Sequence, residues 1–442
     1  MESDTRLQPP PKPSFQEALK FWLKLGFISF GGPAGQIGIM HEFLVEKKRW
    51  ISDSRFLHAL NYCMILPGPE AQQLATYIGW LFHGTLGGLV AGIFFVLPSL
   101  FILLGLSITY VLFGKLAWVA AIFYGLKPAV VVIVILALIK IGKKSLLSLF
   151  HYAVALVSFI CIFFFNIPFP LIILGTIVVA IVGKRILPNL FGGNGIHAKN
   201  ESDESGYALN RFSPPITGGL DLKSISLKVF VGVILWFIPI VLFLFFRPDY
   251  SFWYHLSEFF TKAAFVTFGG AYAVLPYVAQ ESVEKFQWLS QYEMIDGLAL
   301  GETTPGPLIM VLVFVGFMAG YHHGGGSLLD GTFGLLTTTF YTFLPCFLFI
   351  LIGAPLVERT KEHERVKSIL SIVTAAVVGV VLNLTIYFGK AVLFPSKLLE
   401  PDWPSVIWLV ISFIVMYGFK MNMILWIVAS GVAGFVHWLV VS

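Results

Sequence analysis

The sequence predicts an all-α polytopic membrane protein with two homologous repeats of opposite orientation, which contain broken or re-entrant helices and are joined by one extra transmembrane helix. Three observations support this fold class. The 442 residues are 57% hydrophobic and only 12% charged, whereas about a quarter of the residues in a soluble domain are charged. Apolar runs near the length of about 20 residues that spans a bilayer recur along the chain. The two halves also resemble each other in sequence and differ in the sign of their loop charges.

The order of segments follows from composition. Residues 1–14 are polar and rich in proline and lack the apolar core of a secretory signal, so we expect a cytoplasmic N-terminal tail. Residues 15–183 form the first repeat. The polar linker 184–228 is expected to be cytoplasmic. Its stretch 192–206 is expected to be disordered, and the loop 192–222 dispensable for transport. The uncharged apolar run 229–246 predicts the connecting transmembrane helix, and residues 247–442 form the second, inverted repeat.

The internal repeat is defined by two motifs that occur in both halves. Shifting the chain by 238 residues places Phe30-Gly31-Gly32 on Phe268-Gly269-Gly270, and Pro67-Gly68-Pro69 on Pro305-Gly306-Pro307. A nine-residue insertion near 321–331 then raises the shift to 247. The match covers most of both halves. Symmetry predicts that the two Pro-Gly-Pro breaks approach one another near the bilayer midplane, with the Phe-Gly-Gly segments beside them.

Loop charges indicate that the second repeat is inverted. Lys and Arg favour cytoplasmic loops, and the first-half loop 41–55 is basic, whereas its counterpart in the second half has three Glu and one Lys. Conversely, the turn 114–116 contains only Lys115, but its counterpart 358–367 contains four basic residues. One connecting helix between two units that each cross the membrane an even number of times would produce this inversion. Chance variation of loop charges is the alternative.

The duplicated Pro-Gly-Pro motifs interrupt apolar segments and indicate anion binding. Proline removes a backbone N–H and breaks the helix, so each motif is expected to end one half-helix and begin another, with Pro69 and Pro307 in the first turn. The start of a helix presents free N–H groups and a positive dipole end, which attract anions. Interrupted helices at matching positions of inverted repeats are typical of secondary transporters.

Candidate substrate ligands surround both breaks. They combine backbone groups of the motifs with nearby amides, hydroxyls and one cation: Gly31, Gly32, Pro67, Gly68, Pro69, Gln72, Gln73, Lys127, Gly269, Gly270, Thr303, Thr304, Pro305, Gly306 and Pro307. The Gly-Gly pairs permit positive φ and a close approach of the backbone to a ligand. Small residues also let membrane helices pack closely, so both explanations remain open.

Ionisable residues inside apolar stretches are candidates for a charge or coupling role. Lys127 lies in the middle of an apolar span, where a lysine costs roughly 3 kcal/mol on insertion scales, so it is expected to face protein or water. It either contacts the substrate or pairs with a carboxylate and holds the fold. Glu70 and Glu302 flank the breaks and either cap a helix or carry a proton. Lys24 and Lys262 are repeat mates, and they either share such a role or extend to the lipid headgroups.

Other features narrow the class of protein. The three cysteines, Cys63, Cys161 and Cys346, are isolated in apolar surroundings, so neither a cofactor nor a metal site is expected. A net charge of +5 does not suggest a nucleic-acid partner. Trp50 and Trp288 are expected to anchor the chain at the membrane interface.

Four stretches carry a resemblance to a known family. "FGGPAGQIGIMHEFLVEKKRW", "ILPGPEAQQLATYIGW", "FGGAYAVLPYV" and "ETTPGPLIM" resemble the chromate ion transporter (CHR) family, long-chain two-domain type. One departure is that many members have a histidine shortly after the first Gly-Gly-Pro, where this chain has Gly35-Gln36. The resemblance implies export of chromate from the cytoplasm across the cell membrane, and hence chromate resistance.

The residues alone predict only a transporter of small anions. A carrier of sulfate or another oxyanion is one alternative, and a membrane-embedded enzyme, such as a lipid-modifying transferase or a chromate reductase, is the rival class. Besides the substrate, the lipid bilayer is the expected partner, and assembly into a homodimer is left open.

Overall fold

The computed structural model describes residues 9–186, 206–210, 222–357, 364–395 and 400–441, and every regular element among them is helical. In chain order the helices are α1 (Phe15–Ile28), α2 (Gly32–His41), η1 (Glu42–Lys47), α3 (Asp53–Cys63), α4 (Glu70–Phe113), α5 (Ala117–Ser145), α6 (Leu149–Phe165), α7 (Phe169–Ile186), α8 (Leu222–Phe246), α9 (Tyr250–Val266), α10 (Ala271–Gln280), η3 (Glu281–Lys285), α11 (Gln291–Thr303), η4 (Leu308–Met310), α12 (Val311–His323), α13 (Leu328–Val357), α14 (Glu364–Leu393), α15 (Trp403–Phe413), η5 (Ile414–Gly418) and α16 (Met423–Val441).

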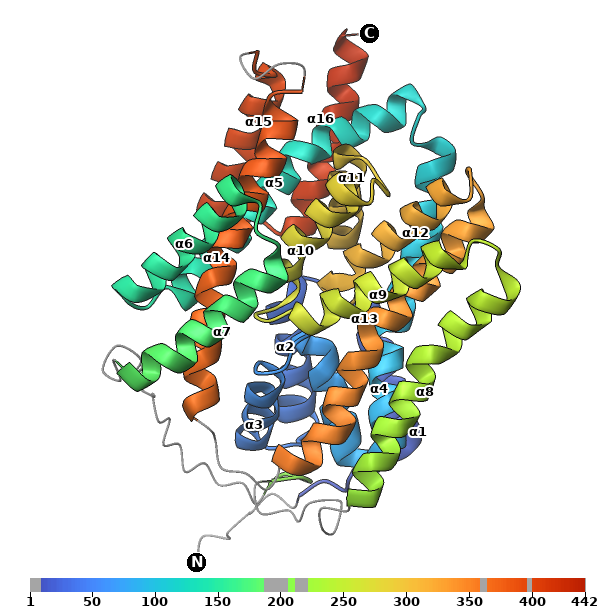
Figure 1. Ribbon diagram of the computed structural model, residues 1–442, viewed down its shortest axis with the longest axis vertical. Helices are drawn as coiled ribbons and strands as arrows, with labels where there is room; N and C mark the ends of the chain where they lie inside the picture. The colour runs from blue at the N-terminus through green and yellow to red at the C-terminus, as the bar shows by residue number, and fades with distance from the viewer. Residues whose placement is uncertain (1–8, 187–205, 211–221, 358–363, 396–399, 442) are drawn as a thin grey trace, which may run out of the picture.

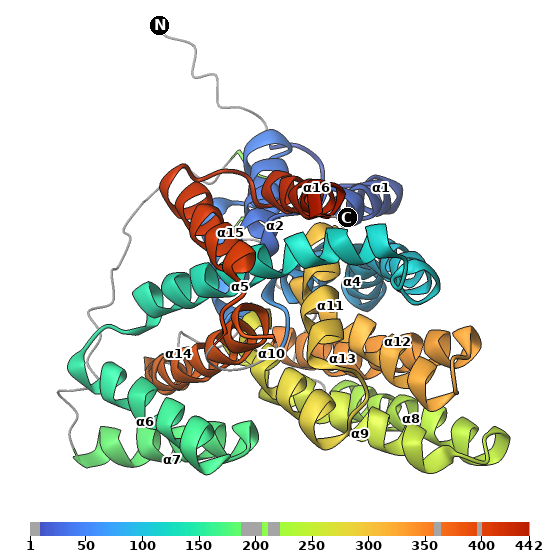
Figure 2. The same ribbon diagram turned by 90° about the horizontal axis from the view of Figure 1, so that it is seen from above.

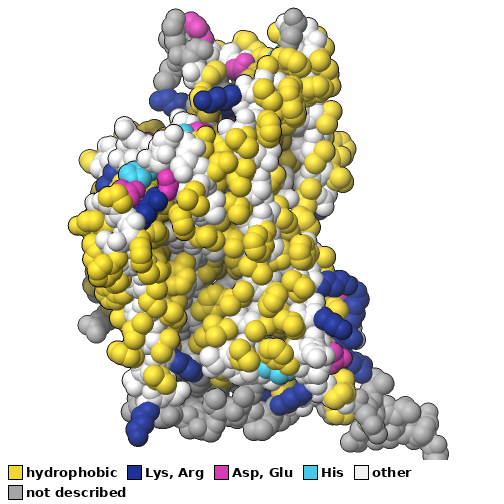
Figure 3. Space-filling view, turned by 90° about the vertical axis from the view of Figure 1, so that its right-hand side faces the viewer, with side chains coloured by type: hydrophobic (Ala, Val, Ile, Leu, Met, Phe, Trp, Pro, Cys, Tyr) yellow, Lys and Arg dark blue, Asp and Glu magenta, His cyan; other side chains and the backbone are white. Residues whose placement is uncertain are grey.

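The prediction of an all-α polytopic membrane protein is confirmed. Among the described residues, six helices are long and apolar enough to cross a bilayer, namely α4, α5, α8, α13, α14 and α16. Hydrophobic side chains cover most of the flank shown in Figure 3, and charged side chains gather mainly toward its ends. The lower ends of α7, α8, α13 and α14 lie at the same end of the molecule as α1 to α3, while α16 ends at the opposite end (Figure 1).

The sequence repeat is also visible in the backbone. Gly31 and its mate Gly269 have φ of 86° and 83°, and Gly68 and its mate Gly306 have φ of 121° and 98°. These values lie in the region that favours glycine. The two halves also share short π-helices, η1 and η3. The same local conformations therefore recur at the same offset.

The second half differs from the first at its insertion. In the first half, α4 continues through a kink at His83 and Gly84, where Gly84 has φ of 64°. In the second half, α12 and α13 are separate helices joined by a turn that contains Gly325 and Gly326, both with positive φ. The inserted residues thus convert a kink into a full turn.

Helices of both halves share the core. Seen from above, α5, α10 and α11 occupy the interior, with the pairs α6–α7 and α8–α9 at the periphery (Figure 2). The larger buried cluster combines first-half side chains such as Val130 with second-half side chains such as Phe314 and Val377. Packing between α5 and α14 therefore joins the halves along their length.

The expectation that Trp50 and Trp288 anchor the chain at the membrane interface is wrong. They are only 6% and 7% exposed. Trp50 contacts the rings of Phe21 and Phe43, and Trp288 stacks on Phe286. Trp288 also contacts the ring of Phe259 on α9, so both tryptophans are core residues, which pack the turn after each π-helix against α1 and α9.

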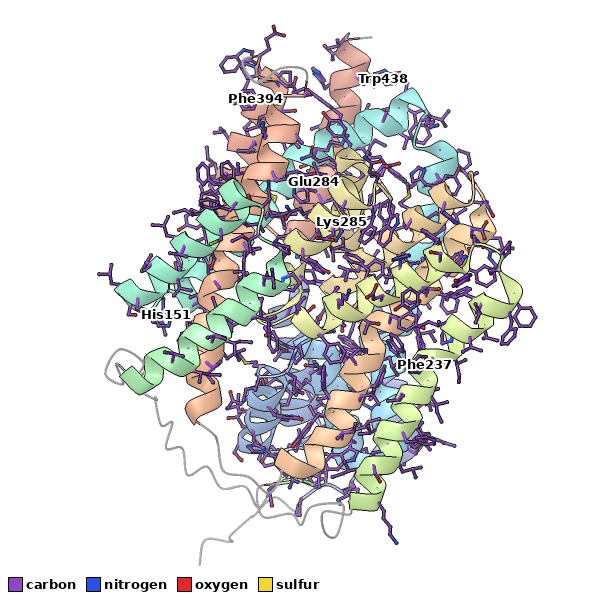
Figure 4. All side chains as sticks on the ribbon, viewed as in Figure 1. His151, Phe237, Glu284, Lys285, Phe394 and Trp438 are labelled. Atoms are coloured by element: carbon purple, nitrogen blue, oxygen red, sulfur yellow. The ribbon has the colours of Figure 1, made fainter. Side chains whose placement is uncertain are left out.

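The connecting helix α8 begins at Leu222, earlier than the apolar run from Val229 that predicted it. Only 6% of its most apolar window is buried, and Phe237 projects from it at the edge of the molecule in Figure 4. This exposure is what a lipid-facing helix requires. Lys228 donates a 2.9 Å hydrogen bond to the carbonyl oxygen of Leu351 on α13, which fixes the first turns of α8.

A short piece of the linker, residues 206–210, packs on the first half, whereas the stretch 192–206 that was expected to be disordered lies outside the described residues except for Gly206. Most of 184–228 lies outside the described residues, but Leu209 forms a parallel bridge with Ile51 and is 1% exposed. Its backbone bonds to Trp50 and Ser52, directly before α3. The linker therefore contributes one apolar side chain to the first-half core.

Candidate functional site

The two Pro-Gly-Pro breaks are joined crosswise to the opposite halves. The N–H of Gly68 donates a 2.7 Å hydrogen bond to the carbonyl oxygen of Thr267, which directly precedes Phe268-Gly269-Gly270. The N–H of Gly306 donates a 2.8 Å bond to the carbonyl oxygen of Ser29, which precedes Phe30-Gly31-Gly32. The prediction that the Phe-Gly-Gly segments lie beside the breaks is thereby confirmed. Each Phe-Gly-Gly segment therefore lies next to the Pro-Gly-Pro break of the other half.

The glycines of the breaks also touch the long helices of the opposite half. A Cβ added to Gly68 would lie 2.6 Å from Sγ of Cys346 on α13, and one added to Gly306 would lie 2.7 Å from Cβ of Ser99 on α4. Ser99 and Cys346 are themselves repeat mates at the offset of 247. Gln36 completes the Gly306 break, because its amide Nε2 donates to the carbonyl oxygens of Gly306 and Ser29.

A cavity of about 700 Å³ lies next to the Gly269-Gly270 pair. Its walls come from α2, α3, the start of α4 and α5 of the first half and from α10 and α14 of the second. The lining residues are Pro33, Ala34, Ile37, Leu60, Asn61, Met64, Ile65, Glu70, Ala137, Lys140, Ile141, Lys144, Ser145, Gly269, Gly270, Ala271, Tyr272, Leu370, Ser371 and Thr374. The cavity therefore lies at the interface between the two halves.

The electrostatics of this cavity suit a small oxyanion. Lys140 and Lys144, from adjacent turns of α5, contribute two cations with exposed side chains at its rim. Gly270 is the N-cap of α10, so the free N–H groups of that helix start at the cavity wall. Ser371 and Thr374 also line the cavity, but the hydroxyl of Thr374 donates to the carbonyl oxygens of Leu370 and Ser371 in its own helix. Ser371 is held by a 3.0 Å hydrogen bond with His151, which is labelled on α6 in Figure 4.

Among the described residues that line the cavity, Glu70 is the one carboxylate. It is the first residue of α4, which matches the capping alternative left open by the sequence. A Cβ added to Gly270 would lie 4.0 Å from its Oε1, so the carboxylate faces the start of α10 across the interface between the halves. Its negative charge therefore lies where an anion would approach.

Of the other predicted site residues, only Gly269 and Gly270 line the cavity. Those outside it are Gly31, Gly32, Pro67, Gly68, Pro69, Gln72, Gln73, Lys127, Thr303, Thr304, Pro305, Gly306 and Pro307, together with Lys24, Lys262 and Glu302. Gln72 and Gln73 are fully buried, and their amide Nε2 atoms donate to Thr76 and to the carbonyl oxygen of Pro67. The hydroxyls of Thr303 and Thr304 donate to backbone carbonyls of their own helix.

Lys127 has a carboxylate partner that the sequence reasoning did not identify. Its Nζ lies 3.8 Å from Oδ1 of Asp296 on α11 and 4.6 Å from the ring centroid of Tyr292. The other oxygen of Asp296 accepts a 2.9 Å hydrogen bond from the hydroxyl of Tyr110 on α4. Asp296 is 5% exposed. In this conformation, Lys127 therefore pairs with a carboxylate, which is one of the two alternatives that the sequence left open.

Glu302 is buried behind the cavity. Its Oε1 accepts a 2.7 Å hydrogen bond from the hydroxyl of Tyr272, whose side chain belongs to the cavity wall. Lys24 and Lys262 are exposed on α1 and α9, and Lys262 forms an ion pair with Glu258 at 2.7 Å. These positions keep the two lysines away from the cavity.

Sequence reasoning missed Lys140, Lys144 and Asp296 as functional candidates. The two lysines follow an apolar run and were not among the predicted site residues, although α5 continues through both of them to Ser145. Asp296 lies in a short helix with low overall hydrophobicity, so it did not stand out as a charge inside a span. The signal that could have found it is Lys127 itself, since a lysine inside an apolar span favours a nearby carboxylate.

Comparisons with known proteins point to one family. The family model described as chromate transporter matches residues 16–183 and 254–435. A probable chromate transport protein of Synechococcus elongatus is 28% identical over 442 residues, which cover 99% of both chains. A chromate transport protein of Pseudomonas aeruginosa is 29% identical over 99% of this chain and 95% of its own length. That of Cupriavidus metallidurans is 28% identical over 86% and 84%. No solved structure matches.

Proposed function

Since this chain belongs to the chromate transporter family, we propose that it exports chromate from the cytoplasm as a secondary transporter and so confers chromate resistance. Chromate is a tetrahedral dianion, and its transport requires recognition without a chemical reaction. Groups that donate hydrogen bonds or carry positive charge must replace its hydration shell.

The observation that carries the proposal is the cavity between the halves. It brings together Lys140, Lys144, the Gly269-Gly270 pair and the start of α10 in about 700 Å³. Two cations can neutralise a dianion, while backbone N–H groups and hydroxyls provide directional hydrogen bonds. The same set suits sulfate, which has nearly the same shape and charge, so a sulfate or general oxyanion carrier is the second candidate.

The basic residues support an opening towards the cytoplasm. Lys140 and Lys144 lie in the last turns of α5, and lysines near the ends of membrane spans favour the cytoplasmic side. We therefore assign the cavity to the inward-facing conformation, which loads chromate from the cytoplasm. The recurrence of the same backbone conformations in both halves supports inverted repeats that move about a shared site and give alternating access.

Membrane potential supports the outward direction. With the inside negative, moving charge outward is favourable by about 2.3 kcal/mol per elementary charge per 100 mV, so a dianion gains about twice that amount. Net export needs no further driving ion on this ground. Glu70 in the cavity wall and Glu302 behind Tyr272 are carboxylates that could couple a proton.

Flux in proteoliposomes tests the proposal. Purified protein is expected to move chromate without changing its oxidation state, and a positive potential on the far side of the membrane should accelerate the flux. Voltage and pH gradients are imposed separately, with sulfate added as a competitor. Equal fluxes of sulfate and chromate would favour the general oxyanion carrier. Reduction of chromate without flux would favour the enzyme class and overturn the proposal.

A further inference from the structure

The helices that line the cavity have repeat mates, and these mates are packed together on the other side of the molecule. The cavity lies between α3, α5 and α14. In the repeat, α11 is the mate of α3, and α5 and α14 are mates of each other. The symmetry of the repeats would therefore place an equivalent cavity between α11, α14 and α5. In the structure, α11 packs directly against both of these helices.

Direct bonds close that side. Nε2 of Gln291 donates a 3.0 Å hydrogen bond to the carbonyl oxygen of Tyr387, and the hydroxyl of Tyr292 donates a 3.3 Å bond to that of Ala391. Tyr387 and Ala391 are the mates of Lys140 and Lys144, which stand at the rim of the open cavity. The ion pair between Lys127 and Asp296 adds a third link, between α5 and α11.

Exposure shows the same asymmetry. Asn61 on α3 lines the cavity and is exposed, whereas its mate Ala299 on α11 is 1% exposed. Met64 lines the cavity and is half-buried, whereas its mate Glu302 is 4% exposed. Equivalent positions are therefore accessible in one half and covered in the other.

The repeat mate of Lys127 lies in the open cavity. Its mate at the offset of 247 is Thr374, which lines the open cavity. The contact with Asp296 at 3.8 Å is longer than a hydrogen bond, and the Oδ1 atom involved has no hydrogen-bond donor among the described residues. This ion pair is therefore an electrostatic contact that can separate without loss of a hydrogen bond.

We infer that a second oxyanion site, related to the first by the symmetry of the repeats, lies behind the Lys127–Asp296 pair. This ion pair is the latch that keeps the second site closed. When α11 moves away from α5 and α14, Lys127 loses Asp296 and lines the newly opened cavity, beside Glu302 and the Gly31-Gly32 pair. There it contacts chromate or sulfate on the exit side. The inference rests on the proposed function, because a transported anion must meet both cavities in turn.

Competition for Lys127 links the anion to the latch. One ammonium group cannot pair closely with Asp296 and a dianion at once, since the two anions repel each other at short distance. An anion that reaches Lys127 therefore favours separation of α11 from α5. Closure after release restores the pair with Asp296 and returns the protein to the conformation of this structure.

Thiol labelling in two positions tests the latch. The starting variant lacks the native cysteines through Cys63→Ala, Cys161→Ala and Cys346→Ser, the last chosen because the mate of Cys346 is Ser99. Ala299→Cys reports the closed side, and Asn61→Cys reports the open cavity. A membrane-impermeant maleimide is applied to each variant in proteoliposomes of known orientation, with and without Asp296→Asn.

Loss of the latch should change the two labels in opposite directions. Asp296→Asn is expected to raise labelling of Ala299→Cys by about tenfold and to lower that of Asn61→Cys, because the population shifts to the other conformation. The charge exchange Lys127→Asp with Asp296→Lys should restore weak labelling at Ala299→Cys. Unchanged labelling, or a parallel increase at both positions, would overturn the inference, since a loosened fold exposes both sides alike.

Chromate flux of the cysteine-free protein, measured in the same vesicles, separates the two hypotheses. Flux with non-reciprocal labelling would overturn the latch and leave the proposed function intact. Reciprocal labelling without any flux of chromate or sulfate would instead overturn the proposed substrate class.

Discussion

The N–H of Gly68 donates a hydrogen bond to the carbonyl oxygen of Thr267 over 2.7 Å, which fixes the break of the first half to the second half. The equivalent bond between Gly306 and Ser29 fixes the break of the second half to the first. Because each half completes the break of the other, neither break can move alone. A perturbation of one glycine should therefore affect the whole transport unit.

Gly306→Ala is expected to destabilise the protein and abolish chromate flux. At φ of 98°, an alanine is strained by roughly 1–3 kcal/mol, and its Cβ would meet Cβ of Ser99 at 2.7 Å. Gly68→Ala should act in the same way through Cys346. Thermal unfolding in detergent and flux in proteoliposomes measure the two effects.

Gly38→Ala is the matched control. This glycine lies within α2, and a Cβ added there meets nothing within 4 Å. Its substitution should leave flux and melting temperature close to those of the wild type. If Gly306→Ala behaves like Gly38→Ala, the crosswise breaks are not needed for function.

Lys140→Ala and Lys144→Ala should weaken chromate binding, because both cations belong to the rim of the cavity. Exposed charges interact weakly, at about 1 kcal/mol each or less, so the double variant should lose about tenfold in affinity. Isothermal titration of purified protein with chromate and with sulfate measures this loss. Lys143→Ala is the control, since Lys143 is on the same helix but lies outside the cavity lining and contacts Tyr417. Equal losses in all three variants would indicate a general effect of basic charge.

Glu70→Gln should strengthen anion binding, because it removes the negative charge that faces Gly270 in the cavity. Less repulsion between this side chain and a bound oxyanion should raise the affinity for chromate by roughly tenfold. If Glu70 couples a proton, the flux of Glu70→Gln should also lose its dependence on an imposed pH gradient. A binding constant equal to that of the wild type would limit Glu70 to capping α4.

Much of the architecture could be predicted from the sequence, because it depends on composition and on motifs duplicated at a fixed offset. The Phe-Gly-Gly and Pro-Gly-Pro segments were correctly placed together. The offset could not say which copy of one motif meets which copy of the other, since both pairings satisfy the same symmetry. The crosswise bonds of Gly68 and Gly306 required coordinates.

The candidate site was harder to predict for a physical reason. Two equivalent halves can be open on either side, and a symmetric sequence pattern does not state which side is open in one conformation. The cavity contains Lys140 and Lys144, while Lys127 is held by Asp296 on the closed side. Lys127 itself lies outside the open cavity, whereas its repeat mate Thr374 lines it. The predicted list of site residues therefore combined residues of the open cavity with residues of the closed side.

Leu209→Asp should destabilise the protein, because this side chain is 1% exposed among first-half core residues. Burying an unpaired carboxylate in place of leucine costs roughly 3 kcal/mol or more. A lower melting temperature in detergent is the expected result. A tolerant Leu209→Asp variant would show that the docked segment is not needed for stability.

Deletion of 192–205, which lies outside the described residues, is expected to leave flux unchanged, in line with the composition of that segment.

Lys127→Ala should abolish flux while leaving chromate binding at the open cavity within about twofold of the wild type, because Lys127 lies outside that cavity and acts on the other side. The substitution also leaves Asp296 buried without a cation, which is expected to lower the melting temperature. Lys127→Ala combined with Asp296→Ala should recover stability but not flux, which separates transport from folding. Lys127→Arg should retain part of the flux, since the charge remains and only the point-like ammonium geometry is lost. Normal flux in the stable double variant would show that Lys127 serves the fold alone. Strongly weakened binding in purified Lys127→Ala would instead place it at the first anion contact.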